Sequence, residues 1–170
     1  MPDLPTTRVV AKSTFYHVRI GLFGPITIEC ATGAQKRWVT LFACLLIRAI
    51  HLEATTDLPA QSFLHFFRGF VTWRGKPKII ISDNATRLKL TAKVLQEIFK
   101  ELATQGIHWK FITQKASWKG GVYERLIELT KMTLRKAIGK QLLNKTDFVT
   151  LLHEVETVIN KRPVTYKDSD

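Results

Sequence analysis

The sequence predicts an α/β fold, a mixed five-stranded sheet with helices on both faces, and three observations support this class. Strand-like segments come first in the chain. Segments with apolar residues at three- and four-residue spacing then alternate with short apolar runs, and two helical segments close the chain. A chain of 170 residues with 45% hydrophobic content forms one domain around a single core.

The first predicted strand covers residues 17–23, where apolar Val18, Ile20 and Leu22 alternate with the other residues. Gly24-Pro25 is expected to break this strand, and residues 26–30 extend it or pair with it. Two further strands are predicted because their segments are rich in β-branched and aromatic residues. They cover residues 38–46 and 47–54.

After Pro59 the apolar spacing becomes helical and predicts a core-facing helix that ends before Gly75. A short and wholly apolar run at 79–81 predicts a strand that is buried on both faces. The remaining predicted elements are a helix over 94–102, a strand over 108–112, a helix over 122–138 that ends at Gly139, and a helix over 148–159 that Pro163 ends.

The charge balance indicates a polyanionic partner. The chain has 26 Lys and Arg against 14 Asp and Glu, a formal charge of +12, which favours nucleic acid over a membrane surface. No apolar run reaches membrane-spanning length, because Arg48 and His51 interrupt the longest one. A solvated basic surface without a specific partner is the alternative explanation.

Cys30 and Cys44 lie in strand-like apolar runs without CxxC spacing. They are expected to be reduced core thiols of a nuclear or cytoplasmic protein, not ligands of a zinc site or partners in a disulfide. His51 and His108 also lie in strand patterns and are expected to be core histidines.

Two acidic residues stand at positions suited to a metal site. Asp83 follows the apolar run 79–81, where a buried strand opens into a turn, and Glu124 follows the Gly120-Gly121 hinge at the start of a long helix. Each also has an ordinary explanation. Asp83 suits an Asx-turn, and an acid in a helix's first turn is favoured by the macrodipole.

The segments GKPKIIISDNATRL, ITQKASWKGGVYERLIEL and VETVINKRPVTY together resemble the integrase core of BEL/Pao-type retrotransposons. The resemblance covers about 5–166 and implies a ribonuclease-H-like fold. On this basis 15–166 is expected to be the domain, with 1–14 an N-terminal tail or linker and 167–170 a C-terminal tail.

The resemblance implies three carboxylates that hold two Mg²⁺ ions about 3.5–4 Å apart. Its second acid falls on Asp83 and its third on Glu124, whereas Gly21 takes the place of the first. Arg19 shares the strand face of Gly21, so a cation is added where a ligand is lost. We hypothesise that the Arg19 guanidinium bridges the two remaining carboxylates.

A third departure lies after Asp83, where Ala85 replaces the family's glycine. Three departures at one centre, beside an intact core pattern, predict that the chemistry is impaired. An error in the sequence at these positions is the competing account. Glu29, the nearest other acid, lies beyond the Gly24-Pro25 break and is not expected to replace the missing ligand.

The helix with Glu124 carries a charged stripe at i, i+4, i+7 and i+11, made by Glu124, Glu128, Lys131 and Arg135. The resemblance makes Lys131 and Arg135 candidate phosphate contacts, and the alternative is a solvated face with weak ion pairs. Lys115 and Lys119, beside the glycine hinge, are further candidates for binding a nucleic-acid strand.

The predicted function is therefore DNA binding without sequence preference by an integrase-like domain of the DNA-integration class, with strand transfer impaired. The alternatives are an active Mg²⁺-dependent polynucleotidyl transferase and a protein-interaction scaffold that uses a dimer face. Mg²⁺ is the expected cofactor if the chain is active, and otherwise none is expected. The expected partners are DNA and, in a homodimer, a second copy, with no membrane.

Overall fold

The computed structural model describes residues 14–55, 60–82, 92–111 and 121–162. Its sheet has the strand order β3-β2-β1-β4-β5. Strand β2 is antiparallel to both of its neighbours, β1 and β3. Strand β4 is parallel to β1, and β5 is parallel to β4. The bounds are β1 His17–Cys30, β2 Gly33–Cys44, β3 Ile50–Thr55, α2 Ala60–Arg74, β4 Ile79–Ser82, α3 Ala92–Thr104, β5 His108–Phe111, α4 Gly121–Ile138 and α5 Lys145–Asn160. The predicted mixed five-stranded α/β fold is confirmed.

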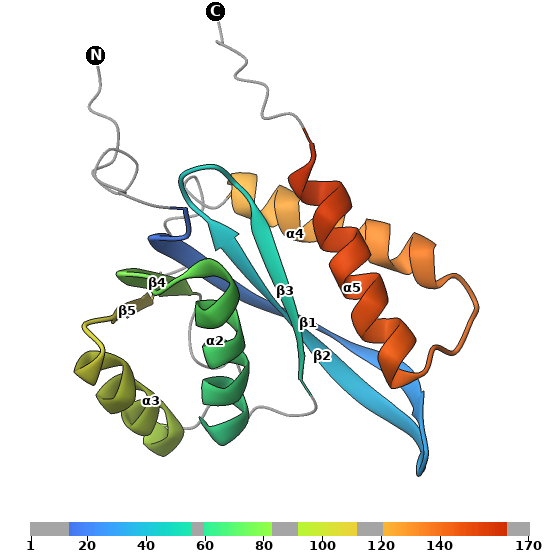
Figure 1. Ribbon diagram of the computed structural model, residues 1–170, viewed down its shortest axis with the longest axis horizontal. Coiled ribbons are helices and arrows are strands. Elements are labelled where there is room, and N and C mark those ends of the chain that lie inside the picture. Colours follow the sequence, from blue (N-terminus) through green and yellow to red (C-terminus); the bar gives the residue numbers. More distant parts are fainter. Residues whose placement is uncertain (1–13, 56–59, 83–91, 112–120, 163–170) are drawn as a thin grey trace, which may run out of the picture.

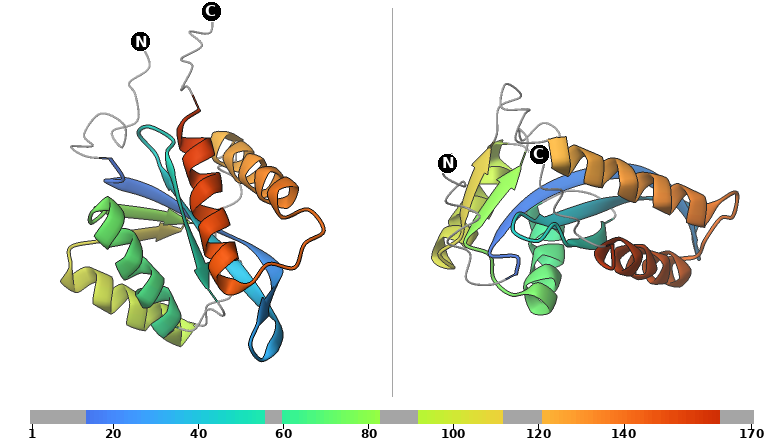
Figure 2. Two further views of the ribbon diagram at one scale, coloured as in Figure 1. Left: turned by 45° about the vertical axis from the view of Figure 1, so that its right-hand side comes forward. Right: turned by 90° about the horizontal axis from the view of Figure 1, so that it is seen from above.

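Helices cover both faces of the sheet, because alternate residues of each central strand point to opposite sides. Val18 and Ile20 of β1 lie in a core cluster with α2 and α3, whereas Phe23 lies in a second cluster with α4 and α5. Figures 1 and 2 show strands β1 and β2 passing between these two helix pairs. The residue at position 21 therefore faces α4 and not α2.

Three predictions about local structure are wrong. β1 does not break at Gly24-Pro25 but continues through a bulge, where its register with β2 shifts between Phe23 and Ile26. The third strand begins only at Ile50, because residues 45–47 form a turn. His108 is exposed at the start of β5 and is not a core residue, since a short edge strand is covered on one side only.

A buried polar cluster joins the edge strand β3 to α2 and α5. The Nε2 of His51 lies 2.7 Å from Glu53 Oε1, and its Nδ1 lies 3.5 Å from Glu156 Oε1. Arg74, at the end of α2, donates to that same Glu156 oxygen and lies with its Nε 3.3 Å from His51 Nδ1. The predicted burial of His51 is confirmed, and the cluster explains how a polar ring is tolerated there.

The cluster shifts two pKa values in opposite directions. Burial acts to lower the pKa of His51, but its bonds to the carboxylates of Glu156 and Glu53 outweigh this and raise the pKa above 6.5. Burial acts to raise the pKa of Glu156, but His51, the Leu52 amide and Arg74 outweigh this and lower it below 4.5. Protonated His51 donates from Nδ1 towards Glu156, whereas neutral His51 accepts there from Arg74.

These shifts predict a stability optimum between about pH 4.5 and 6.5. The contribution of His51 is full below its unfolded pKa and is lost as the pH rises through its folded pKa. The contribution of Glu156 is present above its unfolded pKa and is lost as the pH falls through its folded pKa. Urea unfolding from pH 4 to 9 should show both declines. His51→Gln should remove the decline above pH 6.5, and His153→Gln, at an exposed position, should leave it unchanged.

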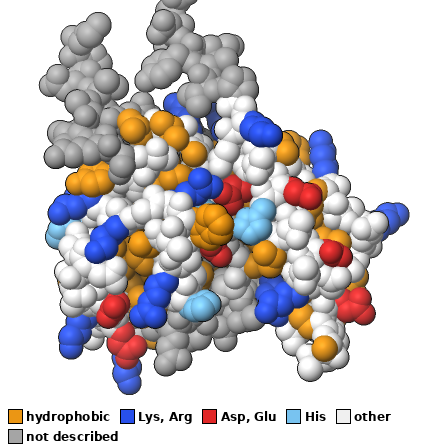
Figure 3. All heavy atoms as spheres, viewed as in Figure 1, with side chains coloured by type: hydrophobic (Ala, Val, Ile, Leu, Met, Phe, Trp, Pro, Cys, Tyr) orange, Lys and Arg blue, Asp and Glu red, His pale blue; other side chains and the backbone are white. Residues whose placement is uncertain are grey.

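No helix among the described residues is long and apolar enough to cross a membrane. The face formed by α2 and α5 in Figure 3 carries Lys and Arg side chains dispersed among acidic and hydrophobic ones. Its positive charge does not gather into one continuous track. The predicted tails, 1–14 and 167–170, fall almost wholly outside the described residues, so the domain division stays a prediction.

Candidate functional site

Gly21 lies in the middle of β1, between two paired strands. It pairs with Leu41 of β2 on one side. On the other side β4 ends at Ser82, whose parallel partner is Ile20, the residue before Gly21. The chain therefore leaves β4 beside Gly21. Ser82 is fully buried, and its Oγ lies 2.6 Å from the indole nitrogen of Trp109, which fixes the end of the strand.

The space in front of Gly21 is occupied by Tyr123 from the first turn of α4. A Cβ atom at position 21 would lie 2.0 Å from the Tyr123 hydroxyl oxygen and 3.1 Å from Ile127 Cδ1. Carbon and oxygen in contact stay more than 3 Å apart, so no larger residue fits at position 21 while Tyr123 keeps this position. The tyrosine fills the volume where the resemblance places the first carboxylate.

Arg19 lies on the same face of β1 as Gly21 and contacts this tyrosine. Its guanidinium carbon is 4.2 Å from the centroid of the Tyr123 ring, a cation–π contact. Only 7% of Arg19 is exposed, so its side chain does not extend into water. His17, two residues earlier on the same face, is also buried.

Glu124 follows Tyr123 directly, but its side chain is exposed. Successive helical residues point about 100° apart, so Tyr123 faces the sheet while Glu124 lies towards solvent. Asp83, Lys115 and Lys119 lie outside the described residues, so their predicted roles, and the predicted Arg19 bridge, stay predictions.

The described residues of this centre do not make a two-metal donor set. They supply one carboxylate, Glu124, and one buried cation, Arg19, which opposes a bound cation. No group of three His, Cys, Asp or Glu that could hold a metal is found within the described part of the chain. Glu29 and Glu53 do not reach the centre either, since Glu29 is exposed near the far end of β1 and Glu53 bonds to His51.

The charged stripe of α4 contains one ion pair. Lys131 Nζ lies 3.4 Å from Glu128 Oε1, an i,i+3 pair, and the Glu128 side chain is 72% exposed. Such an exposed pair contributes only about 0–1 kcal/mol. Arg135 is exposed, and no carboxylate pairs with it in the described ranges. Both cations are thus available to an anionic partner.

Sequence reasoning missed Tyr123 as part of the centre. Tyr123 stands directly before Glu124 in the motif, and its position there does not reveal that it contacts β1. One signal could have identified it: a glycine inside a strand often marks the close approach of another group. Phe23 and Trp38, which line a groove beside Lys131 and Arg135, were missed as well.

The α/β fold is similar to that of retroviral integrase catalytic cores, a ribonuclease-H-like fold. The HTLV-2 integrase catalytic core, solved with magnesium in a trimeric form, has a TM-score of 0.64 at 13% identity and 92% coverage of both chains. The BIV integrase catalytic core has a TM-score of 0.63 at 14% identity, covering 89% of this chain and 87% of its own.

A simian T-cell lymphotropic virus intasome, solved with the PP2A regulatory subunit B56 gamma, has a TM-score of 0.68 at 13% identity, with 93% of this chain and 52% of that chain covered. No protein-family model and no curated protein matches the chain. These identities are low enough that the likeness shows the fold alone. A homodimer of this chain stays a prediction, although the HTLV-2 core was also solved in a dimeric form.

Proposed function

We propose that this chain is a retrotransposon-derived integrase-core-like domain of BEL/Pao type that binds DNA without sequence preference and is impaired in strand transfer. The observation that carries the impairment is the Tyr123 hydroxyl in the volume of the first carboxylate. Asp83 and Glu124 are then the remaining ligand positions of an incomplete metal site, because three carboxylates hold the two ions of such a centre.

The proposed DNA surface is the charged stripe of α4, where Lys131 and Arg135 extend towards β1. Its cations gather in the second half of the helix, which also suits the helix macrodipole. Lys131 and Arg135 lie one turn apart and can contact successive phosphates of one strand. Contacts to phosphates supply affinity without reading the sequence, which fits a chain with a formal charge of +12.

DNA affinity is expected to fall at least about tenfold between 50 and 200 mM salt, because bound phosphates release counterions. The measurement is fluorescence anisotropy with two unrelated duplexes of equal length, which should bind alike. Lys131→Ala with Arg135→Ala should weaken binding to both and reduce the slope of log affinity against log salt by about 2.

The matched control uses the carboxylate that competes with phosphate for Lys131. Glu128→Gln should strengthen binding, since it releases Lys131 and removes a repelling charge. An affinity that ignores salt would contradict the electrostatic mechanism. The absence of DNA binding would favour the protein-interaction scaffold, whereas Mg²⁺-dependent strand transfer by the unaltered chain would favour the active transferase.

A further inference from the structure

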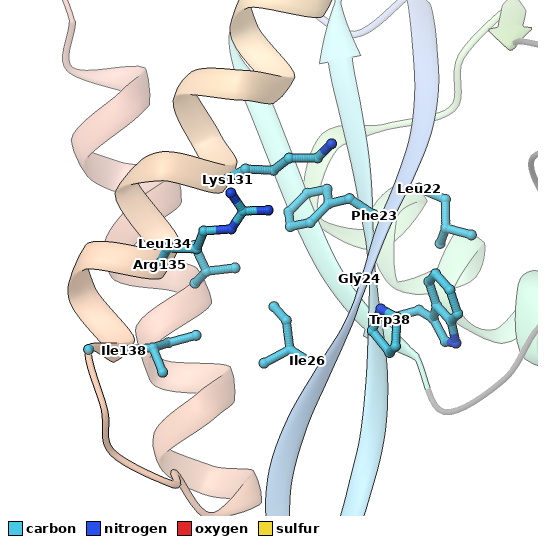
Figure 4. A pocket seen from close by; sticks show the side chains of 11 residues that line it. Leu22, Phe23, Gly24, Ile26, Trp38, Lys131, Leu134, Arg135 and Ile138 are labelled. Carbon is cyan, nitrogen blue, oxygen red and sulfur yellow. The ribbon is translucent and has the colours of Figure 1, made fainter.

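A groove runs between the second half of α4 and the bulged part of β1. Its volume is about 520 Å³, within the range of pockets that take small organic ligands. Figure 4 shows Lys131 and Arg135 extending from α4 towards β1, with Ile26 and Ile138 below them on opposite sides. The groove begins about two turns along α4 from Tyr123, at Lys131, and on β1 it begins at Leu22, the residue after Gly21.

The bulge in β1 creates this groove. The register with β2 shifts between Phe23 and Ile26, and Gly24 adopts a φ of +127° that side chains rarely allow. A bulged strand bends and twists locally. Below the groove, Phe23 and Leu134 belong to the buried core and are 6% and 1% exposed. The floor is therefore a fixed apolar surface.

The lining combines an apolar interior with a cationic rim. Ile26 and Ile138 supply apolar surface, whereas Lys131 and Arg135 supply the only charges among the described lining residues. An occupant must therefore pair a negative group with an apolar, compact one. In nucleic acid the phosphate provides the first and the base provides the second. In a paired duplex the base is stacked, so only an unpaired nucleotide can offer both together.

We infer that this groove receives one unpaired nucleotide of a bound DNA strand. Its flanking phosphates are held by Lys131 and Arg135, and its base lies against Ile26 and Ile138. This inference rests on the proposed DNA binding, because the same two cations hold the strand. It adds a structural preference, for an extrahelical base, to binding that has no sequence preference.

The test compares three labelled duplexes: one fully paired, one with a single extra adenine in one strand, and one with an abasic residue in place of that adenine. The full chain should bind the adenine bulge at least about fivefold more tightly than the paired duplex, because the base buries apolar surface against the two isoleucines. The abasic bulge, which keeps the phosphate and the flexibility, should bind like the paired duplex.

Two variants locate the effect. Ile26→Ala with Ile138→Ala should abolish the preference for the adenine bulge and leave the affinity for the paired duplex unchanged. Val158→Ala, an exposed aliphatic position on α5, should change neither affinity. Thermal unfolding checks that the variants are folded. Should the double variant not fold, the comparison of the three duplexes with the unaltered chain still decides.

Equal binding of the adenine bulge and the paired duplex would overturn the inference and leave DNA binding intact. A preference that the abasic bulge retains would overturn it as well, because deformable DNA would then explain it. A preference that survives the double isoleucine variant would place the base elsewhere and reject this groove. The absence of binding to all three duplexes would instead reject the proposed function.

Discussion

Glu156→Ala is expected to lower the free energy of unfolding by about 3–5 kcal/mol, because it leaves buried charge without its partner. The Glu156 side chain is 8% exposed and bonds to the Arg74 guanidinium. Its second oxygen accepts from the Leu52 amide at 3.3 Å. One change thus removes the group that joins α2, α5 and the edge strand β3.

The edge of β3 makes this carboxylate more important than an ordinary ion pair. Asn160, one turn after Glu156, accepts from the Ile50 amide at 2.7 Å and donates to its carbonyl at 2.8 Å. Together the two α5 side chains satisfy backbone groups that an open sheet edge would leave to other chains. Losing Glu156 therefore exposes the Leu52 amide as well as removing the charge.

Urea unfolding at pH 6 measures the effect, with two matched variants. Glu156→Gln keeps an oxygen for the Leu52 amide and should cost less than Glu156→Ala. Glu154→Ala, at an exposed position of the same helix, should change stability by less than about 0.5 kcal/mol. Equal stability of the Glu156→Ala and Glu154→Ala chains would mean that the cluster contributes nothing.

The sequence predicts the architecture well because its signals are local: the spacing of apolar residues indicates helix or strand, and glycine or proline indicates where an element ends. The predicted ends of α2 at Gly75 and of α4 at Gly139 are confirmed, and both glycines have a positive φ, at 88° and 58°. The continuity of β1 through Gly24-Pro25 was not predictable in this way. Pairing with β2 resumes at Ile26, and that pairing is a property of the sheet and not of the segment.

The candidate site is less predictable because its decisive contact joins residues far apart in the chain. The motif positions identify Gly21 as a missing acid, but what fills its place depends on which side chain α4 turns towards β1. Only the helix orientation shows that Tyr123 does so while Glu124 is exposed. The same orientation explains why Arg19 is buried, since the Tyr123 ring lies against its guanidinium.

Gly21→Ala is expected to destabilise the chain by about 1–3 kcal/mol through overpacking against Tyr123. The direction of the stability change tests the contact, because alanine at a strand position with free space would stabilise the chain relative to glycine. In a Tyr123→Phe background the hydroxyl is absent, and the ring atom nearest to the added Cβ is Cζ, at 3.2 Å. There the substitution should cost at least about 1 kcal/mol less, a coupling that a double-mutant cycle measures. Additive effects would show that the hydroxyl does not exclude side chains from position 21.

Restoring a metal site then requires three changes, because an acid at position 21 needs the space that Tyr123 fills and must not face the Arg19 cation. The variant Arg19→Gly, Gly21→Asp, Tyr123→Val should gain Mg²⁺ binding. With a Kd near 1 mM, 10 mM Mg²⁺ stabilises by about 1.4 kcal/mol and raises Tm by about 3–6 °C. The matched control with Gly21→Asn should show no shift, because it lacks the carboxylate. If the double change at positions 19 and 21 binds Mg²⁺ equally well, Tyr123 is not the obstacle, and the centre is closed by charge alone.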